Sequence, residues 1–352
     1  MGLRQWLVRR AVSGAHVLVV EAPGAWQVRV AAEQAVTLRG WRLAWSPADA
    51  DVLIVCGHPG PQLTEVLDRV WDQLPGPRAR VVALAVGEVG GALDQARSWL
   101  LDDPQQRDEA AQRPLSPAEL EDTDGEGDAD GDDHGDMDHG DMDMSGPGGI
   151  ALAMGGDDRD GLAMDVLHLP LGPVLPHWPP GLVLHCALQG DVITEAQVEV
   201  LDSTDDPTDD PTADPTATQH AARRCDAAVD LLALAGWDAL VVEARLMRDR
   251  LLAEDTDQAA PLHRLRDRVA RSRTLRWSLR GLGRADSGGD TYDRLLDLLA
   301  DEPTSSHSGR DYVETLPQLV TGLDLAAARL VVASLAPMRL RPAAVPSGGG
   351  HG

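Results

Sequence analysis

The feature that most constrains how this chain can fold is a run of five apolar residues, VLIVC, at positions 52–56. A polar turn containing Pro47 precedes the run, and Gly57 ends it. Such a run is typical of a strand that is buried on both faces of a parallel sheet. Apolar residues at helical spacing follow at 62–74, and a second apolar strand is indicated at 81–86. The order strand, helix, strand predicts an α/β domain.

Two acidic tracts divide the chain, whose 352 residues carry a formal net charge of -26. Residues 121–143 are mainly Asp and Gly, and residues 202–214 repeat units of the type DDPT. Such sequences cannot bury enough apolar surface to offset the entropy of ordering, so we predict disordered acidic linkers at 106–148 and 203–219. Their charge would repel phosphate groups, which argues against nucleic acid as a partner.

The linkers separate three regions that we expect to fold. Residues 1–105 form the α/β domain, in which helices flank a parallel sheet. Residues 149–202 form a short β-meander, because apolar residues alternate on both sides of a turn at Gly190. Residues 220–340 are helical, and residues 341–352 form a flexible tail. The predicted fold class is an α/β domain followed by an α+β region.

The last folded region contains three helical patterns. Residues 225–235 and 238–252 predict a helical hairpin hinged at Gly236. A basic helix is indicated at 264–280, and its arginines would face solvent, pair with an acidic linker or bind a partner. A last apolar helix is expected at 323–336.

The strand, helix and strand at positions 46–87 read SPADADVLIVCGHPGPQLTEVLDRVWDQLPGPRARVVALAVG. This text resembles the iron–sulfur small subunit that respiratory complex I shares with the membrane-bound nickel–iron hydrogenases. The resemblance covers the predicted domain 1–105 and implies the α/β fold of that subunit. The cysteine ligands of the family have no counterpart, because neither 21–27 nor 87–91 contains a cysteine.

The whole chain has three cysteines, Cys56, Cys186 and Cys225, which are far apart and form no Cys-x-x-Cys pair. A four-iron cluster normally needs four thiolates, so this polypeptide cannot hold one alone. We expect Cys56 and Cys186, which lie in apolar runs, to be small parts of the core. Their odd number and wide spacing argue against a disulfide scaffold and for a reducing compartment. We therefore predict no bound cofactor and no catalytic residue.

A second segment, DVLHLPLGPVLPHWPPGLVLHCALQGDVITEAQVEVL at positions 165–201, contains the predicted meander. It resembles the start of the large catalytic or quinone-binding subunit of the same complexes. In that family a Gly-Pro-x-His-Pro element leads into a β-meander, and Gly172-Pro173 and His177 occupy those places here. No Cys-x-x-Cys pairs follow, so nickel–iron ligation is excluded.

Three residues are candidate remnants of a quinone pocket. The resemblance implies that His177 corresponds to a histidine near that pocket, although a polar loop residue beside Trp178 would look the same. The text LRWSLRGLGRADSGGDTYDRLLDLL at 275–299 weakly resembles another element of the large subunit, and this adds Arg280 and Tyr292.

The tract at 132–144 combines imidazole, thioether and carboxylate side chains, and this combination indicates metal binding. Thioethers favour Cu(I), and imidazoles suit Cu, Ni and Zn. Compositional drift in an acidic linker explains the same tract without any metal. The candidate ligands are His134, Met137, His139, Met142 and Met144.

Residues 1–10 are basic and contain a tryptophan. They would lie on a membrane surface or form an ordinary helix before the first strand. No stretch reaches about 18 uninterrupted apolar residues, so we predict no transmembrane helix. A small-residue cleavage site is also missing, so we predict no signal peptide. The expected location is cytoplasmic and peripheral, on the inner face of the cell membrane.

These observations predict a catalytically silent, cluster-less accessory subunit of a complex I-like or group 4 hydrogenase-like membrane assembly. Such an assembly would translocate protons and be related to NADH-quinone oxidoreductase. Its membrane subunits, which resemble complex I or antiporter proteins, would be the partners. Two alternatives remain: a metal-handling accessory protein for Cu or Ni that uses the tract at 132–144, and a quinone-linked oxidoreductase subunit.

Overall fold

The computed structural model describes residues 3–113, 154–157, 163–202, 216–253, 259–284, 289–300 and 309–335. By their contacts these residues group into two compact units. Unit 1 contains the described residues of 3–19, 27–56 and 69–113. Unit 2 contains 20–26, 57–68 and the described residues from 154 onward. Two segments of the N-terminal α/β region, 20–26 and 57–68, therefore belong to unit 2.

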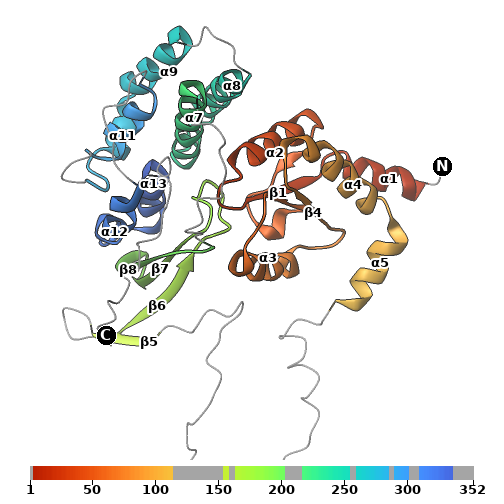
Figure 1. Ribbon diagram of the computed structural model, residues 1–352. Coiled ribbons are helices and arrows are strands. Elements are labelled where there is room, and N and C mark those ends of the chain that lie inside the picture. Colours follow the sequence, from red (N-terminus) through yellow and green to blue (C-terminus); the bar gives the residue numbers. More distant parts are fainter. Residues whose placement is uncertain are drawn as a thin grey trace, which may run out of the picture. The chain divides into compact units, whose positions relative to one another are not determined.

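A four-stranded sheet in the order β2-β1-β3-β4 forms the centre of the N-terminal α/β region (Figure 1). The strands are β1 (His16–Glu21), β2 (Arg42–Leu43), β3 (Val52–Cys56) and β4 (Ala79–Ala83). β1 pairs with β2, and β3 with β4, in parallel. Every residue of β3 is buried, as the apolar run predicts for a strand in a sheet that is covered on both faces. The predicted α/β class is confirmed.

Helices cover both faces of this sheet. α2 (Trp26–Leu38) and α4 (Val89–Leu100) lie on one face, where Arg39 after α2 donates a hydrogen bond to Asp94 of α4. α3 (Pro61–Gln73) lies on the opposite face (Figure 1). α3 has the helical stripe that its spacing predicts, and the buried members of this stripe are Leu63, Leu67, Val70 and Leu74.

The second predicted strand lies earlier in the chain than expected. We placed it at 81–86, but β4 spans Ala79–Ala83. Because β3 ends at Cys56, which pairs with Ala83, the residues after Ala83 have no neighbouring strand to pair with. The chain instead continues through a 3-10 helix at Val86–Glu88 into α4.

Two further helices lie at the ends of this region. α1 (Leu3–Val12) precedes β1, and a 3-10 turn at Pro47–Asp49 precedes β3. α5 (Asp103–Gln112) follows α4 and extends past residue 105, where we predicted the domain to end. The carboxylate of Asp102 caps α5 by accepting a hydrogen bond from the backbone N–H of Gln105.

Unit 2 contains a second sheet, which is antiparallel and has the order β5-β6-β7-β8. The strands are β5 (Met154–Asp157), β6 (Ala163–Leu171), β7 (Leu182–Gln189) and β8 (Val192–Val200). β7 and β8 meet at the predicted turn, where Gly190 has a φ of 63°. The predicted β-meander is therefore confirmed.

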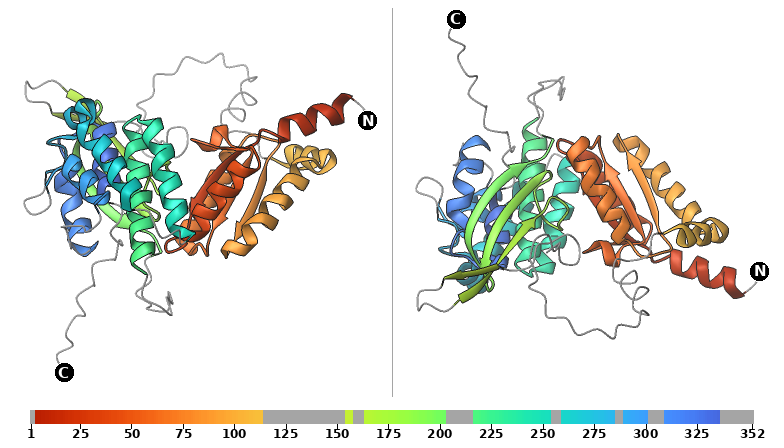
Figure 2. Two further views of the ribbon diagram at one scale, coloured as in Figure 1. Left: turned by 90° about the horizontal axis from the view of Figure 1, so that it is seen from above. Right: turned by 90° about the horizontal axis from the view of Figure 1, so that it is seen from below.

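Two helices pack on this sheet, α12 (Gly309–Val320) and α13 (Leu325–Leu335), and Figure 2 shows them in blue beside the green strands. Alternate residues of β7 enter the shared core, as the period of two in the sequence predicts. The β7 members of this core are Leu182, Leu184, Cys186 and Leu188, and the helix members include Leu316, Val320, Val331 and Val332.

The predicted helical hairpin is α7 (Ala217–Leu234) and α8 (Asp238–Leu252), and the chain turns between them at Gly236, whose φ is 72°. α7 begins earlier than the predicted residue 225. The reason is a capping box, in which the Thr216 side chain and the Gln219 side chain each bind the other residue's backbone N–H.

The basic helix predicted at 264–280 is two helices, α9 (Ala259–Arg271) and α10 (Arg273–Leu279). The side chain of Ser272 accepts a hydrogen bond from the N–H of Leu275 and thereby begins the second helix. α11 (Thr291–Leu298) follows, and the last apolar helix is α13. The buried stripe is as the sequence predicts and consists of Leu262, Leu265, Val269 and Leu275.

Several predictions fall outside the described residues. These are the acidic tract at 121–143, most of the linker at 203–219, the tail at 341–352 and the tract at 132–144. Among the helices that the structure does describe, none has the length and apolar character needed to cross a bilayer.

Candidate functional site

The carboxyl ends of β1 and β3 are the place where a parallel sheet of this type binds ligands. β1 is followed by a loop that ends at Ala25, and β3 is followed by Gly57. Gly57 has a φ of 89°, and a Cβ atom built on it would lie 2.3 Å from the Cβ of Ala25. Only glycine permits this approach. The two loops therefore lie in direct contact at this edge of the sheet.

The cysteines of the chain cannot act as ligands at this edge. Cys56 is fully buried within β3, Cys186 lies in β7 and Cys225 lies in α7. Burial raises the pKa of Cys186 to about 11 and the pKa of Cys225 to about 12, so both are neutral thiols near pH 7. The residues at the sheet edge do not fit an iron–sulfur cluster.

The N-terminus of α3 is capped by Asp202, which lies two residues after the end of β8. The Asp202 carboxylate accepts hydrogen bonds from the backbone N–H of Gln62 at 3.1 Å and of Leu63 at 2.8 Å. The Asp202 N–H donates in return to Gln62 Oε1 at 2.9 Å. A Cβ on Gly60 would lie 2.2 Å from the Asp202 Cγ, so any larger residue at position 60 would displace the Asp202 carboxylate. The helix end that would attract a phosphate therefore holds the chain's own carboxylate.

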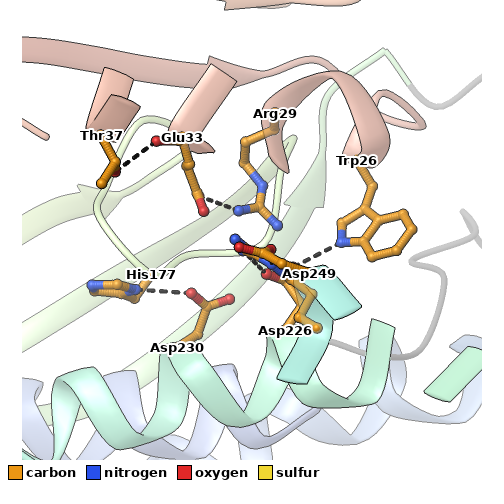
Figure 3. Close-up of polar contacts among 9 residues, drawn as sticks. Trp26, Arg29, Glu33, Thr37, His177, Asp226, Asp230 and Asp249 are labelled. Atoms are coloured by element: carbon orange, nitrogen blue, oxygen red, sulfur yellow. Dashed lines mark hydrogen bonds and ion pairs between the residues drawn. The ribbon is translucent and has the colours of Figure 1, made fainter. Parts of the chain in front are cut away.

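A buried charge network joins the loop after β1 to the helical hairpin of unit 2. Trp26 Nε1 donates to Asp226 Oδ2 at 2.8 Å, and Arg248 Nη1 donates to Asp226 Oδ1 at 2.7 Å. Arg248 Nε donates to Asp249 Oδ1 at 2.9 Å. Figure 3 shows the indole of Trp26 directed toward Asp226. The guanidinium of Arg223 also lies 5.0 Å from the centre of the Trp26 ring.

This network is almost closed to water, since Arg248 is 1% exposed and Asp226 is 5% exposed. A buried charge is tolerated only when it is paired and hydrogen-bonded, and here both oxygens of Asp226 have a donor. The arrangement fixes the indole and two helices relative to one another. A network of this kind orders a scaffold and offers no reactive group to a substrate.

His177, the first candidate for a quinone pocket, lies in the loop between β6 and β7. It stands four residues before Gly181, which directly precedes β7. Its Nδ1 lies 2.8 Å from Asp230 Oδ1, and its side chain is 11% exposed (Figure 3). Asp230 lies one helical turn after Asp226, so α7 presents both carboxylates on one face. His177 is therefore held by α7 and has a φ of 58°, which is unusual for a residue with a side chain.

The loop that carries His177 is tightly packed. A Cβ on Gly172, whose φ is 94°, would lie 2.3 Å from the carbonyl oxygen of Leu182 and 2.4 Å from Trp178 Nε1. Trp178 Nε1 donates to that carbonyl at 2.8 Å. Arg329 of α13 donates to the carbonyl of Pro176 at 2.9 Å. The Gly-Pro and His elements noted in the sequence thus build one ordered loop.

The other two candidates for a quinone pocket, Tyr292 and Arg280, have different surroundings. Tyr292 is buried in α11, and its hydroxyl donates to the carbonyl of Ala270 at 3.1 Å. Arg280 follows the end of α10 with an exposed side chain. Between them, Asp290 caps α11 and accepts the N–H of Gly281.

Burial of Asp290 would raise its pKa, but hydrogen bonds from the backbone N–H groups of Gly281, Asp293 and Tyr292, together with the charge of Arg284, bring it below its ordinary value. The carboxylate of Asp290 is therefore a charged structural anchor.

The candidate metal ligands His134, Met137, His139, Met142 and Met144 lie outside the described residues. Within the described ranges, no three His, Cys, Asp or Glu side chains lie together in a way that could hold a metal ion.

Sequence reasoning missed the residues that organise this site. Asp202 looked like the first residue of an acidic linker, and Asp226 looked like one polar residue in an apolar helix. A signal was present in α7, where Asp226 and Asp230 stand at helical spacing between apolar residues. No pattern in the sequence links Arg248 to Asp226, because that contact depends on how the hairpin folds.

No protein-family model, no curated protein and no solved structure matches this chain.

Proposed function

We propose that the chain is a catalytically silent structural subunit of a complex I-like or group 4 hydrogenase-like membrane assembly. In this assembly it takes the place of an iron–sulfur small subunit and part of a large subunit, and it transfers no electrons. Its partners are the membrane subunits of the assembly, and it is bound peripherally at the inner face of the membrane.

The observation that carries this proposal is the chemistry of the sheet's carboxyl edge. At this edge Ala25 lies against Gly57, and the resemblance to the small subunits would imply a cluster near here. The neighbouring helix end is filled by Asp202, and the indole of Trp26 is bound by Asp226. Contacts that fix the backbone at this edge support a structural role over a redox role.

The distribution of the contacts supports the same role. The loops after β1 and β3 belong to unit 2, together with the β-meander, whose sequence resembles the start of the large subunit. In the similar complexes these two elements come from separate chains. A single chain that retains both elements and lacks both sets of metal ligands is suited to docking other subunits.

Partner identification tests the proposal directly. The tagged full chain is purified from the native membrane in mild detergent, and the proteins bound to it are identified by mass spectrometry. We expect integral membrane subunits of the complex I or antiporter type. A matched purification of the Asp226→Ala, Arg248→Ala double variant should recover fewer of these subunits. Recovery of the chain without any membrane subunit would contradict the proposal.

A metal-handling role is a second candidate, favoured by the His, Met and Asp residues at 132–144. If this role is correct, titration of the full chain with Cu(I) or Ni²⁺ will show tight binding that deletion of 132–144 abolishes. Deletion of the stretch 203–214, which has five Asp against six in 132–144, is the control for nonspecific attraction of cations. Equal binding by both deletion variants would dispose of this candidate.

A further inference from the structure

Helix α10 presents a basic and aromatic surface to solvent. This α10 surface consists of Arg273, Arg276, Trp277 and Arg280, all of which are exposed. Trp277 is 84% exposed, more than any other described tryptophan with an exposed side chain. The opposite side of the helix is fixed in the core by Leu275 and Leu279, so the orientation of the surface is set by packing.

The charge of this region is opposite to that of the chain. Residues 268–284 contain arginine at 268, 271, 273, 276, 280 and 284 and no Asp or Glu, whereas the whole chain carries -26. Arg268 pairs with Glu243, Arg271 with Asp267 and Arg284 with Asp290.

For the other three arginines, 273, 276 and 280, no ion pair is present within the described part of the chain. The α10 surface thus places uncompensated guanidinium groups around an exposed indole. Exposed charge of this density is screened beyond about 8 Å at physiological ionic strength, so a partner at contact distance meets the local positive charge and not the charge of the whole chain.

We propose that the α10 surface binds the headgroup region of an anionic phospholipid bilayer. Arginine binds phosphate through two parallel hydrogen bonds, and basic residues are attracted to the negative surface of such a bilayer. Tryptophan is enriched at the boundary between headgroups and acyl chains, where its ring is apolar and its N–H is hydrogen-bonded. The combination of the two residue types matches lipid better than a purely ionic partner.

Two other occupants fit less well. The acidic tract at 121–143 would pair with the arginines, but it consists mainly of Asp and Gly and offers Trp277 little apolar surface. Single-stranded nucleic acid binds through a series of aromatic side chains, and α10 has one. The proposal needs no partner subunit and goes beyond the proposed function.

Vesicle flotation of the full chain tests the proposal. Vesicles of phosphatidylcholine alone are compared with vesicles that also contain phosphatidylserine, at low and at high salt. We expect binding only to the anionic vesicles, reduced by salt. The triple variant R273Q/R276Q/R280Q should bind about 100-fold more weakly, since each basic residue near an anionic surface contributes roughly a factor of five. Trp277→Ala should also weaken binding.

The matched control is R42Q/R97Q/R250Q, which removes three exposed arginines elsewhere and changes the net charge equally. This variant should bind like the unmodified chain, and circular dichroism checks that each variant is folded. Failure of the unmodified chain to bind, or equal loss in the control variant, would overturn the proposal. Vesicle binding that appears only after deletion of residues 121–143 would show that this segment occupies the α10 surface in the intact chain. Preferential binding of single-stranded DNA over vesicles would show that nucleic acid is the ligand of this surface.

Discussion

At the scale of residues, the most informative feature is the buried pair of Asp226 and Arg248. Each is a charged group that folding removes from water, and each depends on the other for compensation. The sequence could predict that Cys56 and Cys186 are core residues, because small apolar side chains in apolar runs are usually buried. It could not predict the ion pair, because a lone Asp in a helix is most often exposed.

Arg248→Met tests this pair. The substitution leaves the Asp226 carboxylate buried without its ion-pair partner, so we expect the free energy of unfolding to fall by about 3 to 5 kcal/mol. Arg250→Met changes an exposed arginine on the same helix and should cost less than about 0.5 kcal/mol. Urea denaturation followed by circular dichroism measures both. Equal stability of the two variants would show that the buried pair does not stabilise unit 2.

Asp290→Ala tests the second charged anchor through its dependence on pH. Because the pKa of Asp290 is lower in the folded chain, its contribution to stability is present above the pKa of the unfolded state and is lost as the pH falls through the folded-state pKa. We expect the variant to be less stable by about 1 kcal/mol or more at neutral pH, as for a lost helix cap.

That difference should shrink when the denaturation is repeated in increasingly acidic buffer, as the pH falls through the folded-state pKa of Asp290. A stability difference that is the same in neutral and in strongly acidic buffer would contradict the assignment of the lowered pKa.

At the scale of elements, the pattern of apolar residues was sufficient to predict β3, α3, the β7–β8 hairpin and the α7–α8 hairpin. The turns of the two hairpins carry glycine, at Gly190 and Gly236. Local contacts set the ends of the helices and strands, which the pattern of apolar residues does not predict. The Ser272 side chain caps a second helix within the predicted basic helix. β4 ends at Ala83 because Ala83 pairs with Cys56, the last residue of β3.

Gly60→Ala tests the capping of α3. An added Cβ would overlap the Asp202 carboxylate, so we expect the cap to be displaced and the stability to fall by about 1 to 3 kcal/mol. Gly87→Ala is the control, because a Cβ at Gly87 would meet no atom within 4 Å. Thermal unfolding of the two variants measures the difference. An unchanged melting temperature for Gly60→Ala would show that Asp202 does not cap the helix in solution.

At the scale of the whole molecule, the proposed structural role depends on which residues occupy the carboxyl edge of the parallel sheet. The sequence alone indicated that the thiolates were missing, since a count of three cysteines excludes four ligands. It gave no indication of which contacts form at the edge of the sheet. The close approach of Ala25 and Gly57 and the capping by Asp202 depend on segments far apart in the chain, which only the folded structure brings together.

Iron content tests the central claim most directly. The full chain is purified without oxygen from its native host, and its iron is measured by mass spectrometry beside its visible absorption spectrum. A cluster-less subunit predicts far less than one iron atom per chain and no broad visible band. Iron in stoichiometric amount, together with the broad absorption of an iron–sulfur cluster, would contradict the account.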